Sequence, residues 1–526
     1  METVFPCIKE FMLVKTYGSA VYGVEAITIT VEVNWMETGA QYLIVGLPDN
    51  AVKESLQRVE STIRSIGCNM PRTRIVVNLA PADIKKSGTA FDLAIAIGIL
   101  TASGQIGDSD LVEKYVIMGE LSLDGEIRPI KGALPIAIQA RKENFTGLIL
   151  PVSNAREAGM VNNLKVYGVS HITEVIEFFR SNTQSLQPIS INARDEFLKS
   201  QSDFENDFTD VKGQENIKRA LEIAAAGGHN VILIGPPGAG KTMLAKRLPT
   251  ILPPLNLQEA LETTKIHSVA GKLPEHSTLV SKRPFRSPHH TISDVALVGG
   301  GGIPQPGEIS LAHNGVLFLD ELPEFKRTVL EVMRQPMEER RVTISRAKVA
   351  VDFPASFMLV ASMNPCPCGF YNHPQRTCTC PRGTVQKYLN RVSGPLLDRI
   401  DLHVEVTPVA FNELSAGRIQ ESSSDIRARV ITARTIQAER YSSCEGVYCN
   451  AQMSSKLLKK ICVITASGQQ LLKVAMEKLN LSARAYDRIL KVSRTIADLT
   501  ASKDINTEHL SEAINYRSLD REGWGG

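Results

Sequence analysis

Gly235-Pro-Pro-Gly-Ala-Gly-Lys-Thr242 is the stretch of sequence that decides the fold class. It matches the pattern G-x-x-x-x-G-K-[ST], in which a glycine-rich turn joins a strand to a helix. The backbone N–H groups of such a turn point at a phosphate, and the helix N-terminus adds a favourable dipole. Residues 230–234 predict the strand and residues 243–248 the helix, so we expect a parallel α/β domain. The candidate nucleotide-binding residues are Gly235, Pro236, Pro237, Gly238, Ala239, Gly240, Lys241 and Thr242.

Acidic and amide side chains at the ends of two later apolar runs complete the predicted site. We expect Lys241 to reach the β- and γ-phosphates of ATP and Thr242 to ligate Mg²⁺. Asp320 and Glu321 follow an apolar strand, so Asp320 is expected to hold the Mg²⁺ and Glu321 to polarise the attacking water. Asn364 ends a further buried run and is suited to sensing the γ-phosphate. The predicted chemistry is ATP hydrolysis.

Arg399 lies in Leu396-Leu-Asp-Arg-Ile-Asp401, just before a short predicted strand. An arginine at this place can act as a finger that stabilises transition-state charge in the site of a neighbouring subunit. The alternative is an ordinary surface ion pair, and the sequence alone leaves both open.

Length and composition exclude several classes of protein. A chain of 526 residues predicts three to four domains. Hydrophobic residues make up 43% and charged residues 22%, which excludes a largely disordered chain. The net charge of +3 excludes a histone-like polycation, although a local basic surface would still suffice for binding nucleic acid. No apolar run reaches about 18 residues and no signal peptide is recognisable, so we expect a cytoplasmic protein without membrane contact.

Changes in periodicity divide the chain. Residues 1–180 alternate strands and helices and predict an α+β domain, whereas residues 181–207 lack periodicity and predict a linker. Residues 208–410 predict the parallel α/β core. Residues 411–526 predict an all-α C-terminal lid.

Several motifs together resemble the magnesium-chelatase-like AAA+ ATPases, and most closely the YifB/ComM group. They are residues 235–242, Arg283-Pro-Phe-Arg-Ser-Pro-His-His290, residues 317–324, Met363-Asn-Pro-Cys-Pro-Cys-Gly369 and residues 394–405. The resemblance runs from Met12 to Arg521 and implies a ring-shaped homo-hexamer with ATP sites between subunits. It assigns Lys241 and Thr242 to Walker A, Asp320 and Glu321 to Walker B, Asn364 to sensor 1, Arg399 to the arginine finger and Arg484 to sensor 2. Residues 1–11 precede the resemblance and are interpreted as an extension or a mis-assigned start.

The N-terminal residues 81–92 are similar to the proteolytic domain of Lon, where a serine nucleophile pairs with a lysine. Aligning the motif places Thr89 at the serine position and Leu134 where the lysine should fall, with Lys131 three residues early. A Ser–Lys pair needs a lysine to accept the proton of the nucleophile. We therefore expect a Lon-like but non-proteolytic domain that serves as an assembly or nucleic-acid platform.

Four cysteines lie close together within residues 366–380. They are Cys366, Cys368, Cys378 and Cys380. Four thiolates suit tetrahedral Zn²⁺, although one residue between ligands is tighter than the usual two to four. We predict a structural zinc site near Asn364. Free thiols, or His373 as a replacement ligand, are the alternatives. The scattered cysteines predict ordinary buried thiols of a reducing compartment.

Residues 340–351 predict a β-hairpin with Ser345-Arg-Ala347 near its tip. The resemblance implies that this hairpin points into the channel of the ring, where Arg341, Arg346 and Lys348 would face the phosphates of DNA. The alternative is a solvated hairpin with ordinary charges. Residues 295–307, with four consecutive glycines, predict a second, flexible insertion loop.

Three functions compete. The first is a hexameric DNA motor for helicase or branch-migration activity in recombination or natural transformation, as the resemblance implies. The second is a chaperone-like AAA+ remodeller of proteins, like magnesium-chelatase motor subunits. The third, a Lon-type protease, is disfavoured by Leu134. The basic hairpin favours the first, and an aromatic pore loop would favour the second.

Overall fold

The computed structural model divides the chain into two compact units. One contains Met1–Leu198 together with Ala260–Val280, and the other contains Lys199–Glu259 together with Ser281–Gly526. The residues that the structure describes are 13–36, 41–189, 191–192, 197, 201, 204–273, 278–302, 304–346, 349–371, 373, 375–381, 383–408, 420–444, 446–479, 481–517 and 519. No helix in these ranges is long and apolar enough to cross a membrane.

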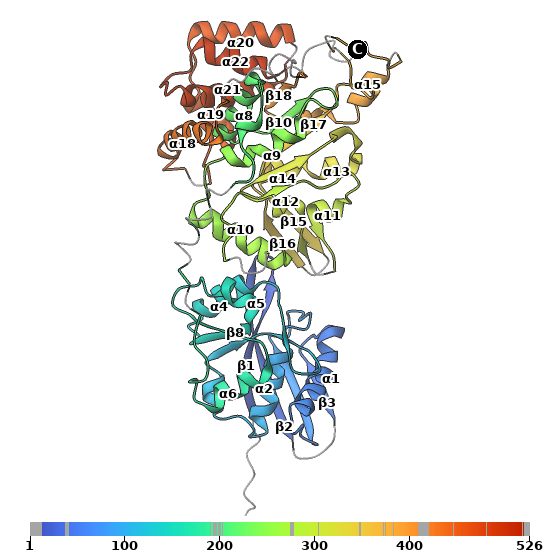
Figure 1. The fold of residues 1–526 in the computed structure, drawn as a ribbon, viewed down its shortest axis with the longest axis vertical. Helices are drawn as coiled ribbons and strands as arrows, with labels where there is room; N and C mark the ends of the chain where they lie inside the picture. The colour runs from blue at the N-terminus through green and yellow to red at the C-terminus, as the bar shows by residue number, and fades with distance from the viewer. Residues whose placement is uncertain are drawn as a thin grey trace, which may run out of the picture. The chain divides into compact units, whose positions relative to one another are not determined.

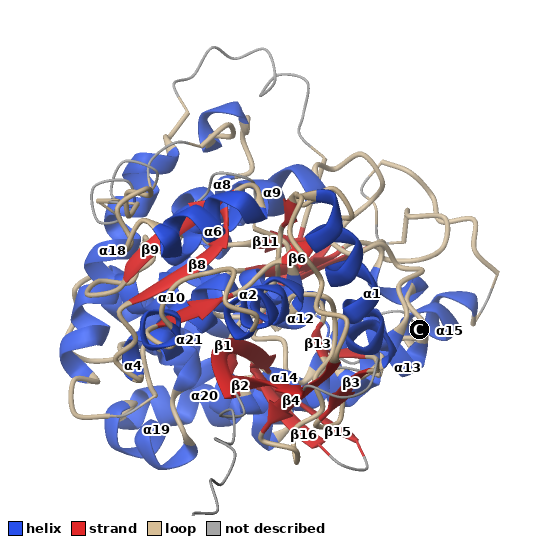
Figure 2. Cartoon of the chain, turned by 90° about the horizontal axis from the view of Figure 1, so that it is seen from below, coloured by secondary structure: helices blue, strands red, loops and turns tan. Residues whose placement is uncertain are grey.

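The first unit is built on a mixed seven-stranded sheet (Figure 1). In sheet order its strands are β3 (Tyr42–Val45), β4 (Arg74–Ala80), β2 (Glu25–Met36), β1 (Leu13–Tyr22), β5 (Tyr115–Ile117), β8 (Gly147–Pro151) and β9 (Lys165–Val169). β1, β2 and β4 are antiparallel neighbours, whereas the outer strands pair in parallel. β8 and β9 lie side by side in Figure 2. β2, β3 and β4 form where β-branched and other apolar residues are concentrated, near residues 26–33, 41–45 and 74–79, in keeping with the α+β domain that the sequence predicts.

The helices of this unit bury apolar faces against the sheet and against one another. They are α1 (Asn50–Ser65), α2 (Asp92–Ala102), α3 (Ser109–Val112), α4 (Ala133–Lys142), α5 (Val152–Ala158) and α6 (Ile172–Arg180), with a short ladder of β6 (Glu120–Leu121) and β7 (Ile127–Arg128). Every residue of α2 is buried, as its apolar sequence predicts. A Cβ at Gly98 would lie 2.7 Å from Val33 Cγ2, so the glycine lets α2 approach β2 closely.

The second unit contains a five-stranded sheet whose neighbours are all parallel. In sheet order its strands are β11 (Phe285–Arg286), β14 (Val316–Leu319), β17 (Met358–Met363), β10 (Val231–Ile234) and β18 (Leu402–Glu405). The predicted parallel α/β core is confirmed. Because β10 lies between β17 and β18, residues that follow several of these strands meet at one edge of the sheet.

The remaining elements of this unit are mostly helices. Up to residue 397 they are η1 (Phe208–Asp210), α8 (Glu215–Gly227), α9 (Lys241–Ile251), the start of α10 (Leu257–Ala270, most of which belongs to the first unit), α11 (Asp294–Val298), α12 (Glu308–Leu311), η2 (Leu322–Glu324), α13 (Arg327–Val332), α14 (Arg334–Glu339), α15 (Thr384–Leu389) and α16 (Gly394–Leu397). The C-terminal part is helical: α18 (Ser423–Arg440), η3 (Asn450–Gln452), α19 (Ser455–Ile461), α20 (Ala466–Leu479), α21 (Ala483–Leu499) and α22 (Thr507–Asn515).

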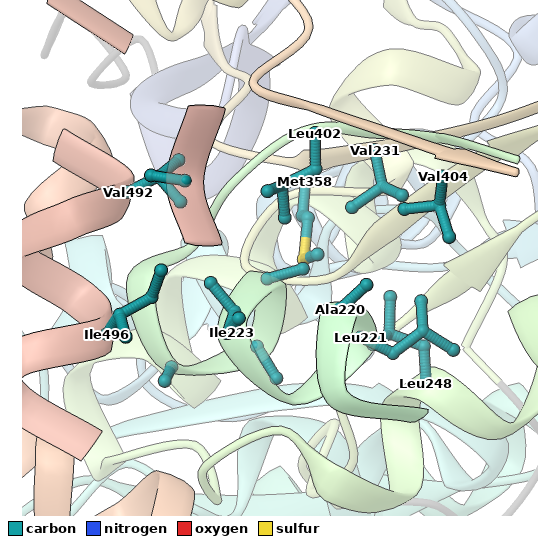
Figure 3. Close-up of a cluster of buried hydrophobic side chains, with 14 of the residues drawn as sticks. Ala220, Leu221, Ile223, Val231, Leu248, Met358, Leu402, Val404, Val492 and Ile496 are labelled. Atoms are coloured by element: carbon teal, nitrogen blue, oxygen red, sulfur yellow. The ribbon is translucent and has the colours of Figure 1, made fainter. Parts of the chain in front are cut away.

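One apolar core joins the sheet of the second unit to its C-terminal helices. α8 packs against both α18 and α21. Figure 3 shows the shared cluster, with side chains from α8, β10, α9, β17, β18 and α21. Val492 and Ile496 of α21 are each 1% exposed. Burial of this kind stabilises by about 25 cal/mol per Å² of apolar surface, so α21 is an integral part of the core.

The predicted hairpin is present as β15 (Arg341–Arg346) paired with β16 (Val349–Pro354). Val342 and Phe353 face each other in the ladder and are buried, at 2% and 0% exposure. The hairpin therefore has one apolar face, which its alternating sequence predicts.

Residues 295–307 differ from the flexible loop that we expected. The segment begins within α11 and continues into β12 (Gly299–Gly300), which pairs with β13 (Gln305–Pro306) in antiparallel fashion. A Cβ at Gly299 would lie 2.5 Å from Gln305 O, and its φ is +111°. Gly299 thus allows close strand pairing, which was not predicted from the sequence, and the flexibility of the segment stays a prediction.

Candidate nucleotide site and cysteine cluster

The glycine-rich turn leaves β10 at Gly235 and enters α9 at Lys241, as the sequence predicts. A Cβ at Gly235 would lie 2.3 Å from Val406 O, so no other residue fits there without a shift. Gly238 and Gly240 have φ of +78° and +87°, a conformation that glycine adopts without strain. Gly240 is also the N-cap residue of α9. The turn therefore places backbone N–H groups at a helix N-terminus, which is the geometry that binds phosphate.

The ammonium group of Lys241 lies among three oxygen acceptors. It donates to Gly235 O at 2.7 Å, to Pro236 O at 3.0 Å and to Asn364 Oδ1 at 3.1 Å. Burial lowers the pKa of Lys241, and the nearby Asp320 and Glu321 oppose that shift. The lysine is thus held at the turn by groups that a phosphate can replace, one of which is Asn364, and the role of Asn364 in sensing the γ-phosphate stays a prediction.

Thr242 and Asp320 form the second contact of the site. The Thr242 hydroxyl donates to Asp320 Oδ2 at 2.7 Å. The other carboxylate oxygen of Asp320 accepts from the Ser362 hydroxyl and, at 3.1 Å, from the backbone N–H of Glu321. A hydroxyl and a carboxylate so placed are ligands that Mg²⁺ prefers, so these residues fit the ion. Ser362 was missed in the sequence because its only signal is its place in the β17 run.

Glu321 follows Asp320 in the left-handed conformation, with φ of 54°. Its side chain is 59% exposed, and its Oε2 lies 3.8 Å from His290 Nδ1. This orientation leaves the carboxylate free to meet a water molecule. His290 ends the motif 283–290, which the sequence singled out without giving the histidine a role.

Tyr388 of α15 is a further residue that sequence reasoning missed. It is 7% exposed, and burial raises its pKa while the backbone of Asn364 lowers it. Burial, with the negative charge of Glu324, raises the pKa of Tyr388 to about 12. The tyrosine therefore stays neutral beside Asn364.

Arg399 and Arg484 have partners other than the residues of the turn. Arg399 is largely buried; its guanidinium donates to Pro395 O at 2.6 Å and pairs with Glu338 Oε1 at 2.7 Å. Arg484 is 56% exposed, and its guanidinium lies 4.0 Å from Asp398 Oδ2. Within the described residues, the group formed around Lys241 thus contains neither arginine. Both keep their proposed roles as predictions.

Of the three hairpin cations, only Arg341 has a described side chain. It is 59% exposed and lies 3.6 Å from Glu339 and 3.9 Å from Asp352. Lys348 lies outside the described residues, and for Arg346 only the backbone is described. A DNA-binding role for the three residues therefore remains a prediction.

The four cysteines of the 366–380 segment come together. Their sulfur atoms all lie within 4.8 Å of one another. Cys366 Sγ is 3.3 Å from Cys368 Sγ and 3.7 Å from Cys378 Sγ. Four sulfurs around one Zn²⁺ at 2.3 Å would be about 3.8 Å apart, so the cluster fits a tetrahedral thiolate site. His373 is not among the residues whose ligand atoms lie together, and its Nδ1 accepts from the backbone N–H groups of residues 375 and 376.

The backbone around the cluster also suits a metal thiolate. Although desolvation favours the neutral thiol and raises the pKa of Cys366 and of Cys380, hydrogen bonds from the backbone of Phe370 and Thr379 lower the pKa of Cys368. Such donors stabilise the deprotonated sulfur that a metal requires.

In the first unit, the Thr89 hydroxyl donates to the Glu120 carboxylate. Leu134, at the position where the lysine of a Lon-type pair was sought, is fully buried. Thr89 is therefore paired with a carboxylate rather than with a lysine base.

Three family models match successive parts of the chain. "Magnesium chelatase, subunit ChlI" matches residues 207–414, "Subunit ChlI of Mg-chelatase" matches residues 31–154, and "Magnesium chelatase, subunit ChlI C-terminal" matches residues 420–517. The parallel sheet and the polar group at its edge thus belong to a magnesium-chelatase-type AAA+ domain.

Similarity to individual proteins identifies the family within this class more closely. Competence protein ComM of Haemophilus influenzae is 44% identical over 508 residues, covering 96% of this chain and 97% of that protein. The uncharacterized protein YifB of Salmonella typhimurium is 42% identical over 507 residues, covering 95% and 96%. The chain belongs to the YifB/ComM family of magnesium-chelatase-like proteins. Lon protease 2 of Bacillus subtilis matches a shorter stretch, at 34% identity over 154 residues, 27% of this chain and 26% of the protease. Family membership supports an ATPase of the AAA+ type that uses ATP and Mg²⁺.

Proposed function

We propose that the protein is an ATP-hydrolysing, ring-forming hexameric motor that acts on DNA. The observation that carries the ATPase part is the group of side chains around Lys241. In this group Thr242 contacts Asp320, and Asn364 contacts Lys241, at the edge of one parallel sheet. Each of these contacts joins residues from different parts of the chain, so the fold assembles the site.

The residues of the site divide the work of phosphoryl transfer. The turn and Lys241 bind the phosphates, and Thr242 and Asp320 would hold Mg²⁺, which neutralises phosphate charge when bound. Asn364 positions Lys241 from the neighbouring strand. The exposed Glu321 carboxylate orients a water molecule and accepts its proton. Phosphoryl transfer depends mainly on such positioning and charge stabilisation.

A hexameric ring would give Arg399 and Arg484 their functions. Neither is bonded to the group around Lys241 within the described part of one chain. We propose that Arg399 reaches the nucleotide bound by a neighbouring subunit, and that Arg484 senses the nucleotide from α21. Native mass measurement of the Glu321→Gln variant with ATP tests the assembly, with six subunits as the expected number.

DNA is the substrate that we propose for the motor. The support is twofold: the Haemophilus relative is named a competence protein, and the β15–β16 hairpin carries basic residues. The test measures ATPase rates with single-stranded, duplex and forked DNA at fixed salt. Stimulation by at least one of them is expected. No stimulation by any of them would favour the protein-remodelling function instead.

We propose that the cysteine cluster holds one structural Zn²⁺ and that the protein works in the cytoplasm. The sulfur positions fit the ion, and all described cysteines are free thiols, as in a reducing compartment. Elemental analysis of protein purified without chelators should find about one zinc per chain. Protein without metal would contradict the zinc assignment and leave four free thiols.

For the first unit we propose a Lon-like, non-proteolytic platform. The contact between Thr89 and Glu120, together with the buried Leu134, supports this proposal. Incubation with unfolded casein and ATP should yield no new fragments, and Thr89→Ala should leave ATPase activity unchanged. Cleavage that Thr89→Ala abolishes would overturn it.

A further inference from the structure

We propose that the cysteine cluster braces the glycine-rich turn, so that metal loading of the cluster sets the affinity for nucleotide. The cluster is formed by Cys366, Cys368, Cys378 and Cys380. This inference rests on the proposed nucleotide site and adds a regulatory input to it. Two separate contacts connect the cluster to the turn.

The first contact runs through the backbone. Asn364 lies two residues before Cys366, at the end of β17, and its side chain accepts from Lys241 at 3.1 Å. A metal ion bound by Cys366 thus also restrains Asn364, whose side-chain amide holds the phosphate-binding lysine.

The second contact is a direct one between the two loops. Gly369 follows Cys368, and its N–H donates to Cys366 O at 2.9 Å, which closes a tight turn between the first two cysteines. This turn lies against Pro237 of the glycine-rich turn. A Cβ added at Gly369 would meet Pro237 Cδ at 2.5 Å, and the φ of Gly369 is +84°. The contact therefore requires a glycine held at this place.

The sulfur cluster is what can hold the cysteine loop in position. The described residues between 366 and 380 form no helix or strand. Ordering such a loop costs conformational entropy, and metal binding supplies the free energy that offsets it. Without metal, the four sulfur atoms are joined only by weak thiol contacts, so the two pairs of cysteines hold each other less firmly.

Thermodynamic linkage makes the proposal reciprocal. If metal raises the affinity for nucleotide by some factor, nucleotide must raise the affinity for metal by the same factor. Couplings of this kind are typically about 5- to 150-fold. We expect a value of at least ~5-fold here.

The experiment uses the full chain with a fluorescent ADP analogue as the nucleotide probe. Affinity is measured for the zinc-loaded protein, for protein stripped by a chelator that is then removed, and for stripped protein reloaded with Zn²⁺. Reloading with Co²⁺ reports ligation independently, because a tetrahedral thiolate site gives intense visible absorption. We expect stripping to weaken ADP binding at least ~5-fold and reloading to restore it. ADP should strengthen Zn²⁺ binding against a competing chelator by the same factor.

Two glycine variants separate the effect of the contact between Gly369 and Pro237 from the effect of the metal. Gly369→Ala keeps all four cysteines and should keep the Co²⁺ spectrum while weakening ADP binding, because its Cβ collides with Pro237. Gly446→Ala is the matched control: its φ is +74°, but nothing lies within 4 Å of the added Cβ. It should match the wild type in both measurements.

The outcomes distinguish the two levels of the proposal. Zinc-loaded protein that binds no ADP would overturn the proposed nucleotide site, and the brace with it. Protein that binds ADP equally well with and without metal, and equally well with Gly369→Ala, would overturn the brace alone. Absence of both zinc and a Co²⁺ spectrum would also overturn it.

Discussion

Lys241 shows how single atoms of this site depend on distant parts of the chain. Its ammonium group is satisfied by two carbonyls of its own turn and by Asn364, which is 123 positions away. The same burial that lowers the pKa of Lys241 makes a phosphate a favourable partner, because a buried charge needs a counter-charge.

Lys241→Ala should therefore lower ATP hydrolysis by ~100-fold or more, since the β- and γ-phosphates lose their charge partner. Steady-state phosphate release measures the effect. Lys246→Ala is the matched control, because Lys246 is exposed on the same helix, α9. An unchanged rate in Lys241→Ala would remove the lysine from the site.

Glu321→Gln separates binding from hydrolysis. The amide cannot accept the proton of the attacking water, so the rate should fall ~100-fold or more while ATP still binds. Nucleotide affinity and single-turnover hydrolysis are measured together. Glu324→Gln, which alters an exposed carboxylate paired with Arg391, serves as control. A Glu321→Gln enzyme that turns over at the wild-type rate would exclude Glu321 as the base.

At the scale of elements, the sequence predicted the helices and strands that are marked by a regular apolar pattern or by turn residues within the segment itself. The helix of residues 92–102 and the hairpin of residues 341–354 follow from their apolar patterns. β1 was missed, because its sequence mixes polar and apolar residues and its pairing with β2 decides its structure. The polar group around Lys241 was predicted because its members follow apolar strands. Ser362, His290 and Tyr388 were not, because their roles come from contacts that no local pattern encodes.

The β15–β16 hairpin offers a test of the DNA proposal. If Arg341, Arg346 and Lys348 contact phosphates, replacing all three by alanine should weaken DNA binding on every sequence. Each lost contact should reduce the slope of log affinity against log salt by about 0.7 to 0.9. DNA affinity across a salt series measures this, with basal ATPase expected to survive.

The control for the hairpin removes the same charge elsewhere. Lys456, Lys459 and Lys460 are exposed on α19, and their triple alanine variant should keep the wild-type slope. Equal slopes in the hairpin variant and the wild type would favour a protein substrate.

Helix α21 contains a partly buried lysine, Lys491, whose positive charge destabilises the fold by an amount that depends on pH. Burial, aided by the positive charge of Arg488, lowers the pKa of Lys491 to about 8. Its ammonium group donates to Ala451 O at 3.0 Å. The unfolded chain binds the proton more tightly than the folded protein, so this group destabilises the fold at pH 7 and less so as pH rises above 8.

Lys491→Met should therefore stabilise the protein at pH 7, by up to about 3 kcal/mol less the lost hydrogen bond. The gain should fade toward pH 10. Thermal denaturation at pH 7 and pH 9 measures it against Lys478→Met, which removes an exposed lysine of α20. A gain that is independent of pH would show that the charge of Lys491 carries no penalty.

At the scale of the whole molecule, each compact unit contains residues that are far apart in the sequence. Residues 260–280 belong to the first unit, although sequence patterning assigned them to the α/β core. Within that unit the N–H of Gly132 donates to Ser268 O at 3.1 Å. Residues that are 136 positions apart in the sequence share no local pattern. The sequence therefore could not predict that residues 260–280 pack with the first unit.

The ring itself is tested through Arg399, whose guanidinium pairs with Glu338 in its own chain. In a head-to-tail ring, each site joins the glutamate of one subunit to the arginine of the next. Mixing Arg399→Ala with Glu321→Gln subunits in equal amounts should leave about a quarter of the interfaces with both groups intact. Each variant alone has none, so ATPase activity should rise on mixing and follow the mixing ratio. Mixtures no more active than the single variants would contradict action in trans and leave Arg399 as an internal partner of Glu338.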